Sequence, residues 1–436
     1  MTRTRKWLAG VGIAVAVVLM LGLIGLSLIP SDKELAQRTA AKLTEVSGVP
    51  VTVGALRWRL LPVPSVVLQN VVTEQARPIE LKQVTLYFEL GALLQRRIKV
   101  DRVLLEGATV PQLSLRTIGK TSGADNAPGT LPFALDGLPL ARFEFRDVTW
   151  LTRRGLALVY EGEVDFDANW RPRTGQLRRP GVAPAADLSI TRESQEDRWA
   201  TRIQLAGGTA NGELRLQTRA DGRLHLGGNL KPEGIDAAQA VVAFNRRAVL
   251  AGKASGVTTL SADGGTLVEL AQSLHTTSTL RVSRARLLRF DLEKAVRSAG
   301  REHAGQTPLD SLTAQLDTQN TAQGIVIDFS NVKASSGALT ATGKGRLANQ
   351  TIEAEVAVDL VSGLVGVPLT ISGPVSAVKV SVPAGAVAGA AVGTAVLPGI
   401  GTAIGARIGA TLGNIFGAKP APAPGKKPPV LAPVTR

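Results

Sequence analysis

The chain has 436 residues, 3 histidines and no cysteine, which excludes disulfides, thiolate nucleophiles and cysteine-bound metals. Its 50 lysines and arginines outnumber its 35 aspartates and glutamates, and the resulting net charge of +15 would favour nucleic-acid binding in a cytoplasmic protein, although solvated strand faces rich in arginine explain it better than a specific patch. The compartment decides which polyanion the chain meets, and the N-terminus predicts the compartment.

The first thirty residues have the pattern of a membrane anchor. A basic tip, residues 1–6, carries Arg3, Arg5 and Lys6, whereas residues 7–29 carry no charge. A helix over 7–29 spans about 34 Å, enough to cross a bilayer core. A cleavable signal peptide is the alternative, but its apolar region is shorter, roughly 7 to 15 residues. The predicted anchor includes Trp7, Leu19, Leu23 and Ile29.

The positive tip sets the predicted topology. Basic flanks stay in the cytoplasm, so everything after the anchor is exported. We therefore expect a single-pass protein of a bacterial inner membrane with its bulk in the periplasm. There the accessible polyanions are phospholipid head groups and lipopolysaccharide, so no nucleic-acid partner is predicted.

A helix and then a long series of strands are predicted after the anchor. Residues 31–47 form the helix, with Ser31 and Glu34 as a capping box and Gly48 at its end. From residue 49 to about 382, short apolar runs are separated by Gly, Pro, Asn and Asp, which is typical of strands and turns. Helices are predicted to interrupt this pattern at 235–250, 267–274 and 290–301.

Two polar stretches, residues 119–129 and 171–184, are predicted as long loops. They divide the exported part into an N-terminal β segment at 31–118, a middle β segment at 131–250 and a C-terminal β segment at 251–382. One continuous sheet with long insertions would give the same pattern.

Alternating strands predict a sheet with one apolar face. Residues 352–360 alternate most clearly, residues 325–329 do so more loosely, and Asp221-Gly222 marks a hairpin turn. The apolar face must be covered by a second sheet, by helices or by a ligand, so a β-sandwich is one alternative and a ligand-covered groove another. The apolar positions on these strands are Ile325, Ile327, Phe329, Ile352, Val356, Val358 and Leu360.

Two blocks of the chain resemble the AsmA family. In the first block, the residues, their order and their spacing all match the start of AsmA-family proteins. The second block agrees with the C-terminal region of that family. Two residues depart from the family pattern, Thr276 and Ala285, where glycine is usual. The resemblance covers residues 1–118 and 265–382 but not the middle segment. It is carried by the anchor, by 48–53, 60–71, 88–100 and 103–107, and by 273–274, 280–282, 290–292, 324–325, 343–345 and 367–373.

The resemblance implies an elongated, curved β-sheet groove that projects from the inner membrane and carries acyl chains on its apolar concave face. The expected function is phospholipid transport between inner and outer membranes in support of outer-membrane biogenesis. Its expected partners are phospholipids, the inner membrane and envelope or outer-membrane proteins. The alternatives are a non-enzymatic assembly factor for outer-membrane proteins and a membrane scaffold.

The sequence gives no pattern for catalysis. His225, His275 and His303 are scattered, without the spacing of a metal site. Asp165 and Asp167 share one face of a predicted strand, but flanking charges favour a solvated edge. We therefore predict no enzymatic activity, no metal and no cofactor.

Glycines recur every four residues near the C-terminus, in the segment 384–418. On helices this spacing lines glycine along one face and lets backbones pack closely, as in membrane helices. The break at Pro398-Gly399 predicts a glycine-zipper helical hairpin, and a weakly ordered tail is the alternative. Residues 419–436 are proline-rich and predicted to be extended. The zipper glycines are Gly385, Gly389, Gly393, Gly401, Gly405, Gly409, Gly413 and Gly417.

Overall fold

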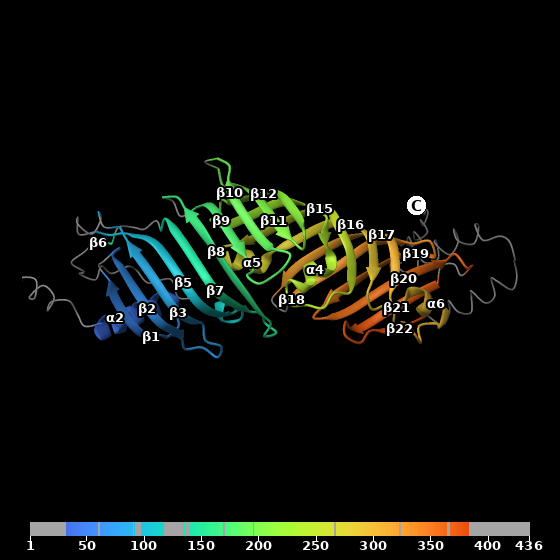
Figure 1. Ribbon diagram of the computed structural model, residues 1–436, viewed down its shortest axis with the longest axis horizontal. Helices are drawn as coiled ribbons and strands as arrows, with labels where there is room; N and C mark the ends of the chain where they lie inside the picture. The colour runs from blue at the N-terminus through green and yellow to red at the C-terminus, as the bar shows by residue number, and fades with distance from the viewer. Residues whose placement is uncertain are drawn as a thin grey trace, which may run out of the picture. The chain divides into compact units, whose positions relative to one another are not determined.

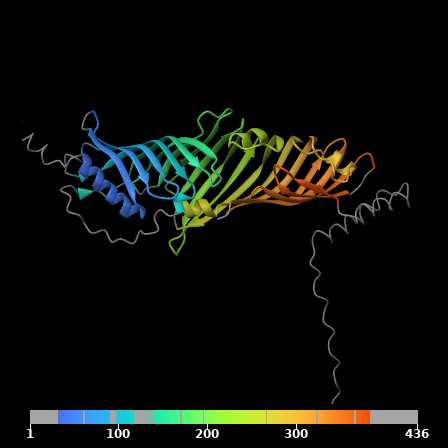
Figure 2. The same cartoon turned by 90° about the horizontal axis from the view of Figure 1, so that it is seen from below.

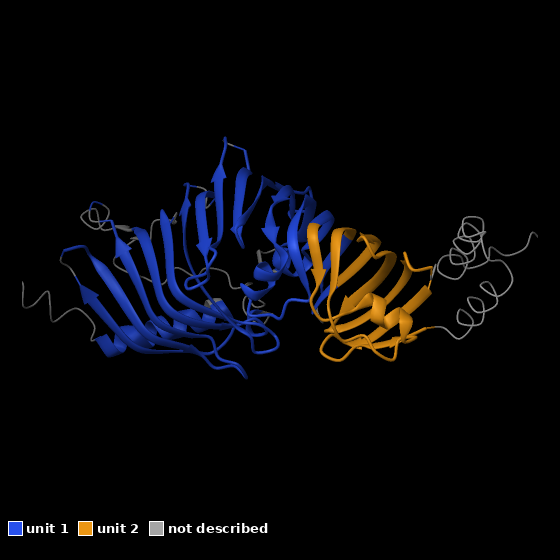
Figure 3. Ribbon diagram, turned by 45° about the vertical axis from the view of Figure 1, so that its right-hand side comes forward, with its two compact units in different colours: residues 1–282, 316–326 blue, residues 283–315, 327–436 orange. Residues whose placement is uncertain are grey.

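The chain forms two compact units in a computed structural model (Figure 3). Unit 1 comprises residues 1–282 and 316–326, and unit 2 comprises residues 283–315 and 327–436. The structure describes residues 32–59, 62–89, 91, 97–116, 134–135, 140–168, 171–194, 196–265, 267–321, 324–363 and 367–382.

Unit 1 begins with a helix and continues as a series of strands (Figure 1). Its helices are α2 (Asp32–Ser47), α4 (Ala237–Val242) and α5 (Leu267–Ser273), with a 3-10 turn at Ser114–Arg116. Its first strands are β1 (Val51–Arg59), β2 (Ser65–Thr73), β3 (Glu80–Phe88), β4 (Arg97–Ile98), β5 (Val100–Pro111), β6 (Ala134–Leu135), β7 (Arg142–Leu151) and β8 (Ala157–Phe166). They are followed by β9 (Pro172–Arg178), β10 (Ala186–Arg192), β11 (Arg198–Leu205), β12 (Gly208–Thr218), β13 (Leu224–Glu233), β14 (Ile235–Asp236) and β15 (Leu250–Gly264).

Most strands pair with their neighbours in the sequence. Within the large sheet the pairing from β1 to β15 is antiparallel, except that β5 and β7 run parallel, as do β4 and β6 in their separate pair. Twenty strands of the described chain belong to one open, mixed sheet, and β4 with β6 forms a separate two-stranded pair. A β-sandwich requires two packed sheets, so the described strands support the single open sheet over the sandwich alternative.

The N-terminal helix anchors one end of the unit 1 sheet. The predicted helix at 31–47 is confirmed as α2 over its described residues, and Gly48 ends it with a φ of 71°. Figure 2 shows α2 lying along the first strands of the sheet. Along α2, Leu35, Ala36 and Leu43 pack into a core that includes Val51 of β1. The other buried members of this core are Leu56, Val66, Leu68, Val71, Phe88, Val100 and Leu140. The helix therefore buries its apolar side against the first strands.

The predicted hairpin is confirmed and one predicted loop is wrong. Asp221-Gly222 joins β12 to β13, and Gly222 has a φ of 78°, which suits glycine in a tight turn. The stretch 171–184 contains β9 instead of forming one long loop. It has little strand propensity of its own, but β8 and β10 hydrogen-bond it from both sides, so sheet context decides its conformation. The predicted loop at 119–129 lies outside the described residues.

Two predicted helices are shorter than expected, whereas α5 matches the prediction at 267–274. The segment 235–250 is helical only over Ala237–Val242, where Asp236 caps the first turn and Asn245, with a φ of 55°, lies beyond the end. The segment 290–301 is helical only as α6 (Leu292–Arg297), which Asp291 caps through its contact with the Lys294 backbone N–H.

Unit 2 contains α6 and the last strands. Strands β16 (His275–Leu287), β17 (Thr307–Thr321) and β18 (Gly324–Ser335) contribute residues to both units. The remaining strands, β19 (Leu339–Ala348), β20 (Thr351–Leu360), β21 (Val367–Pro374) and β22 (Lys379–Ser381), pair antiparallel in chain order. The predicted strand at 352–360 is confirmed as β20, against which α6 packs.

Candidate functional site

The strand register gives the unit 1 sheet an apolar face and a polar face. Leu188 of β10 lies opposite Leu177 of β9 and Ile203 of β11, so side chains of one kind fall on one face. The same register continues through β8, β12 and β13. We call the resulting row the apolar stripe: Tyr160, Val164, Leu177, Leu188, Ile190, Ile203, Leu214, Leu226 and Leu230.

The apolar stripe differs in burial from the packed end of the sheet. Under α2 the apolar side chains are buried, whereas every member of the stripe is only half-buried. Among the described helices of unit 1, α2 packs against β1, α4 against β14 and β15, and α5 against β15 and the last strand of the stripe, β13. The middle of the sheet therefore offers apolar surface to a ligand.

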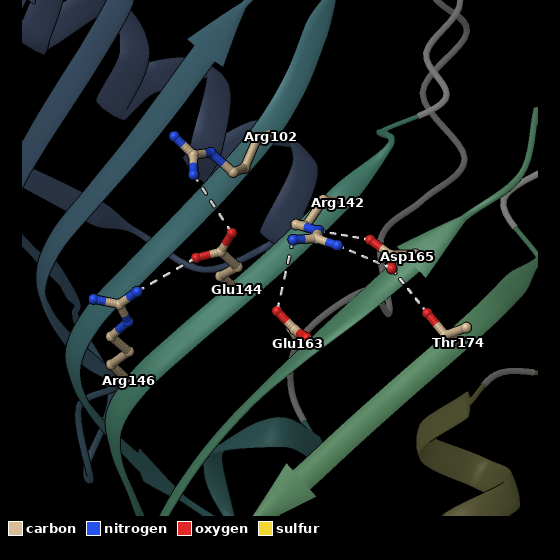
Figure 4. Close-up of polar contacts among 7 residues, drawn as sticks. All are labelled: Arg102, Arg142, Glu144, Arg146, Glu163, Asp165 and Thr174. Carbon is tan, nitrogen blue, oxygen red and sulfur yellow. Dashed lines mark hydrogen bonds and ion pairs between the residues drawn. The ribbon is translucent and has the colours of Figure 1, made fainter. Parts of the chain in front are cut away.

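Ion pairs hold the opposite face together (Figure 4). Arg142 of β7 donates two hydrogen bonds to the Asp165 carboxylate of β8, from Nε at 2.6 Å and from Nη2 at 3.1 Å. Thr174 of β9 donates to the same carboxylate at 2.8 Å. Glu144 of β7 pairs with Arg102 of β5, whose Nη1 lies 3.5 Å from its Oε1, and with Arg146 of its own strand, whose Nη2 lies 3.6 Å from its Oε2. These cross-strand contacts link β5, β7, β8 and β9 on the polar face.

The ion pair between Arg142 and Asp165 shifts the pKa of both side chains. The hydrogen bond from Arg142 lowers the pKa of Asp165 despite partial burial, and the same bond raises the pKa of Arg142. Strand β8 pairs with β7 and β9, so the predicted solvated edge at Asp165 is wrong: this is an internal strand. Asp167 lies beyond the strand and binds Arg192 separately.

A depression of about 370 Å³ lies over β7 to β11. Its lining includes Glu144, Glu161 and Arg202 of the polar face. Charged groups of both signs line it, with Glu161 paired to Arg178 at 2.7 Å. The depression is therefore polar, and it does not extend the apolar surface of the stripe on the other face.

The groove candidates predicted from sequence fall into three environments. Ile325 is 52% exposed, and Ile327, Phe329, Ile352 and Val356 are half-buried. In contrast, Val358 and Leu360 are 0% and 4% exposed, so they belong to the packed core of unit 2. A lipid contact remains a prediction for the exposed and half-buried positions. The anchor residues and the zipper glycines lie outside the described residues.

The apolar stripe lies in the predicted middle β segment, 131–250, which the AsmA resemblance does not cover and which carries none of the predicted groove residues. The alternation Leu188-Ser189-Ile190-Thr191 was a usable signal there. Glycine at Gly162, Gly175 and Gly212 interrupts the apolar period on the neighbouring strands, which hides the pattern from a search along the sequence. Pairing across strands restores it.

The histidines lie apart and each has its own partner. His225 Nδ1 lies 2.8 Å from Asp263 Oδ1, and His275 Nε2 lies 2.9 Å from Asp317 Oδ2. The ring of His303 packs against Phe290 with centroids 5.5 Å apart. Within the described ranges, no three acidic or histidine side chains are grouped as a metal site requires.

Comparison with known proteins matches one part of the chain to a protein family. A family model described as Glycine zipper, of the Omp type, matches residues 383–420. This match confirms the glycine zipper predicted at 384–418 as a sequence assignment and indicates a protein associated with a membrane of the cell envelope. None of the helices described by the structure is long and apolar enough to span a membrane, and the predicted anchor at 7–29 lies outside them. No curated protein and no solved structure matches the chain.

Proposed function

We propose that this protein is a non-enzymatic lipid carrier of the bacterial envelope, anchored in the inner membrane with its bulk in the periplasm. It binds the acyl chains of phospholipids on the apolar stripe and supports phospholipid transport between inner and outer membranes. Its partners are phospholipids and envelope proteins, and its role needs no chemical step.

The observation that carries the proposal is the half-buried apolar stripe on an open sheet. Nine large apolar side chains from β8 to β13 share one face, while charged residues share the other. An extended apolar surface of this kind on an exported protein is normally covered by a partner, and acyl chains match its chemistry. The glycine-zipper match and the AsmA resemblance support the same envelope setting.

The test places one charge on each face of a single strand. Ile190 lies in the apolar stripe, and the next residue, Thr191, is exposed on the polar face. We expect Ile190→Asp to remove most of the phospholipid that co-purifies with the full chain, because an unpaired carboxylate among acyl chains is costly. Thr191→Asp, the matched control, should keep the wild-type lipid content. Lipid is measured by mass spectrometry of extracts after purification in mild detergent.

Thermal unfolding separates lost binding from lost folding. An open face lets the new carboxylate stay hydrated when no lipid is bound, so Ile190→Asp should still unfold cooperatively. If it does not fold, Ile190→Ser provides the same comparison with a smaller perturbation. Absence of phospholipid from the wild-type protein, or equal lipid content in both Asp variants, would contradict the proposed function.

A further inference from the structure

An arginine is buried on the apolar side of the unit 1 sheet. Arg178 ends β9 on the polar face, where its Nε lies 2.7 Å from Glu161 Oε1. The next residue, Arg179, continues the pairing with a backbone N–H that donates to Ala186 O at 3.0 Å. Strand alternation turns its side chain to the opposite side, and the residue is only 8% exposed.

The surroundings of Arg179 are aromatic, and no carboxylate of the described residues forms an ion pair with it. Its guanidinium carbon lies 5.6 Å from the ring centroids of both Tyr160 and Phe244. Nε is 3.5 Å from the carbonyl oxygen of Val159, at the limit of a hydrogen bond. Among the described residues, Nη1 has no hydrogen-bond partner. Burial raises the pKa of Tyr160, and the charge of Arg179 opposes that rise, so the phenol stays neutral beside the cation.

A buried guanidinium without an anion is unfavourable. Desolvation of a charge is offset only in part by contacts with aromatic rings. An anionic ligand would supply the missing hydrogen-bond acceptors, and guanidinium groups bind phosphate oxygens with well-matched geometry. The unpaired Nη1 therefore points to an oxyanion as the ligand.

The segments that meet around Arg179 are basic. Asn245 Nδ2 donates to Ala157 O at 3.0 Å, which joins the chain after α4 to the start of β8. The stretches 152–160, 178–186 and 237–250 contain no aspartate or glutamate. Besides Arg179 and Arg178, the latter paired with Glu161 on the polar face, they carry Arg153, Arg154, Arg246 and Arg247. A ligand with a negative head group is thus favoured at this position.

We propose that Arg179 binds the phosphate of a phospholipid head group whose acyl chains lie along the apolar stripe. The inference rests on the proposed function and specifies where the head group sits. Tyr160, whose ring lies 5.6 Å from the Arg179 guanidinium carbon, and then Leu177 and Leu188, which lie opposite each other on β9 and β10, would contact the first part of the acyl chains. The combination of an unpaired cation and adjoining apolar surface favours a lipid over free phosphate.

The test compares the two neighbouring arginines by the same substitution. Delipidated full-length protein in mild detergent is titrated with fluorescent phosphatidylglycerol, with a diacylglycerol of the same chains and label, and with inorganic phosphate as competitor. We expect wild type to bind phosphatidylglycerol at least about tenfold more tightly than diacylglycerol, as one charged hydrogen bond allows. Arg179→Met should remove this preference while diacylglycerol binding persists. Arg178→Met should keep it, and Arg179→Lys should keep part of it.

The outcomes distinguish this inference from the function on which it rests. Equal binding of the two lipids by wild type, or an unchanged preference in Arg179→Met, overturns the head-group site and leaves the carrier function intact. Failure of wild type to bind either lipid overturns the carrier function itself. Competition by inorganic phosphate at the concentration of the lipid assigns the site to free phosphate and contradicts the proposal. Arg179→Met keeps an apolar side chain of similar length, so it should remain folded, as thermal unfolding will confirm.

Discussion

Arg142 and Asp165 join β7 to β8 through two hydrogen bonds on the polar face. Asp165 is the better buried of the two, with 21% of its side chain exposed against 43% for Arg142. The hydrogen bond lowers the pKa of Asp165 below its ordinary value of 3.8. A carboxylate with a depressed pKa stabilises the fold above its unfolded-state pKa, and this stability is lost as the pH falls through the folded-state pKa.

We therefore expect the effect of Asp165→Asn to depend on pH. At pH 7 the variant should lose about 1 kcal/mol of unfolding free energy, because Arg142 is partly solvated and the pair is weakened by water. Below about pH 4 the difference from wild type should begin to shrink, because the carboxylate of the unfolded chain becomes protonated there, and it should vanish as the pH falls through the lowered pKa of folded Asp165. Thermal unfolding from pH 7 to pH 3 measures this. Exposed Asp310 provides the control, and an Asp165→Asn difference that stays constant with pH would contradict the role of the ion pair.

At the scale of elements, the β12–β13 hairpin depends on close backbone approach. A Cβ added at Gly212 of β12 would lie 1.9 Å from the carbonyl oxygen of Asn229 on β13. A Cβ added at Gly227, on the partner strand, would come no closer than 3.6 Å to the His225 ring. The two glycines therefore face different packing although they occupy one hairpin.

Alanine at these two glycines should separate steric from entropic effects. Gly212→Ala must displace backbone, so we expect it to destabilise the fold by about 1 to 3 kcal/mol. Gly227→Ala should cost little or even stabilise by up to about 1 kcal/mol, because it reduces the freedom of the unfolded chain. Urea unfolding of both variants measures the difference. Equal stabilities would contradict the close approach at Gly212.

The elements also show how far sequence reasoning reaches. Periodicity predicted β20 and the hairpin because their apolar positions and turn residues are local features. It missed β9, where Pro172 and Gly175 disfavour a strand and neighbouring strands impose the pairing. It also could not separate Val358 from Val356, because burial of Val358 depends on the packing of unit 2, which alternation along one strand does not encode.

At the scale of the whole molecule, the proposed function combines a sheet that has two different faces with terminal segments that the sequence predicts to associate with membranes. The two faces could be predicted in principle from β10, where apolar and polar residues alternate. The extent of the apolar stripe could not, since it emerges only when six strands, β8 to β13, are placed in register. Arg179 was equally hidden, because its burial depends on Phe244, which is 65 residues away in the sequence.

The glycine zipper gives the prediction that concerns the whole chain. Gly405 and Gly409 belong to the four-residue repeat within the matched segment 383–420, and Ala406 lies one position off it. If the repeat is a helix-packing face, a larger side chain on that face pushes the helices apart, whereas a larger side chain one position away faces a different direction. We therefore expect Gly405→Leu and Gly409→Leu to reduce crosslinked oligomers or to release the isolated zipper segment, fused to a soluble reporter, from membranes. Ala406→Leu should behave like wild type. Crosslinking in cells followed by membrane fractionation measures both effects. Equal behaviour of all three variants would favour a weakly ordered tail, because a chain without helix packing has no preferred face for the leucine to disturb.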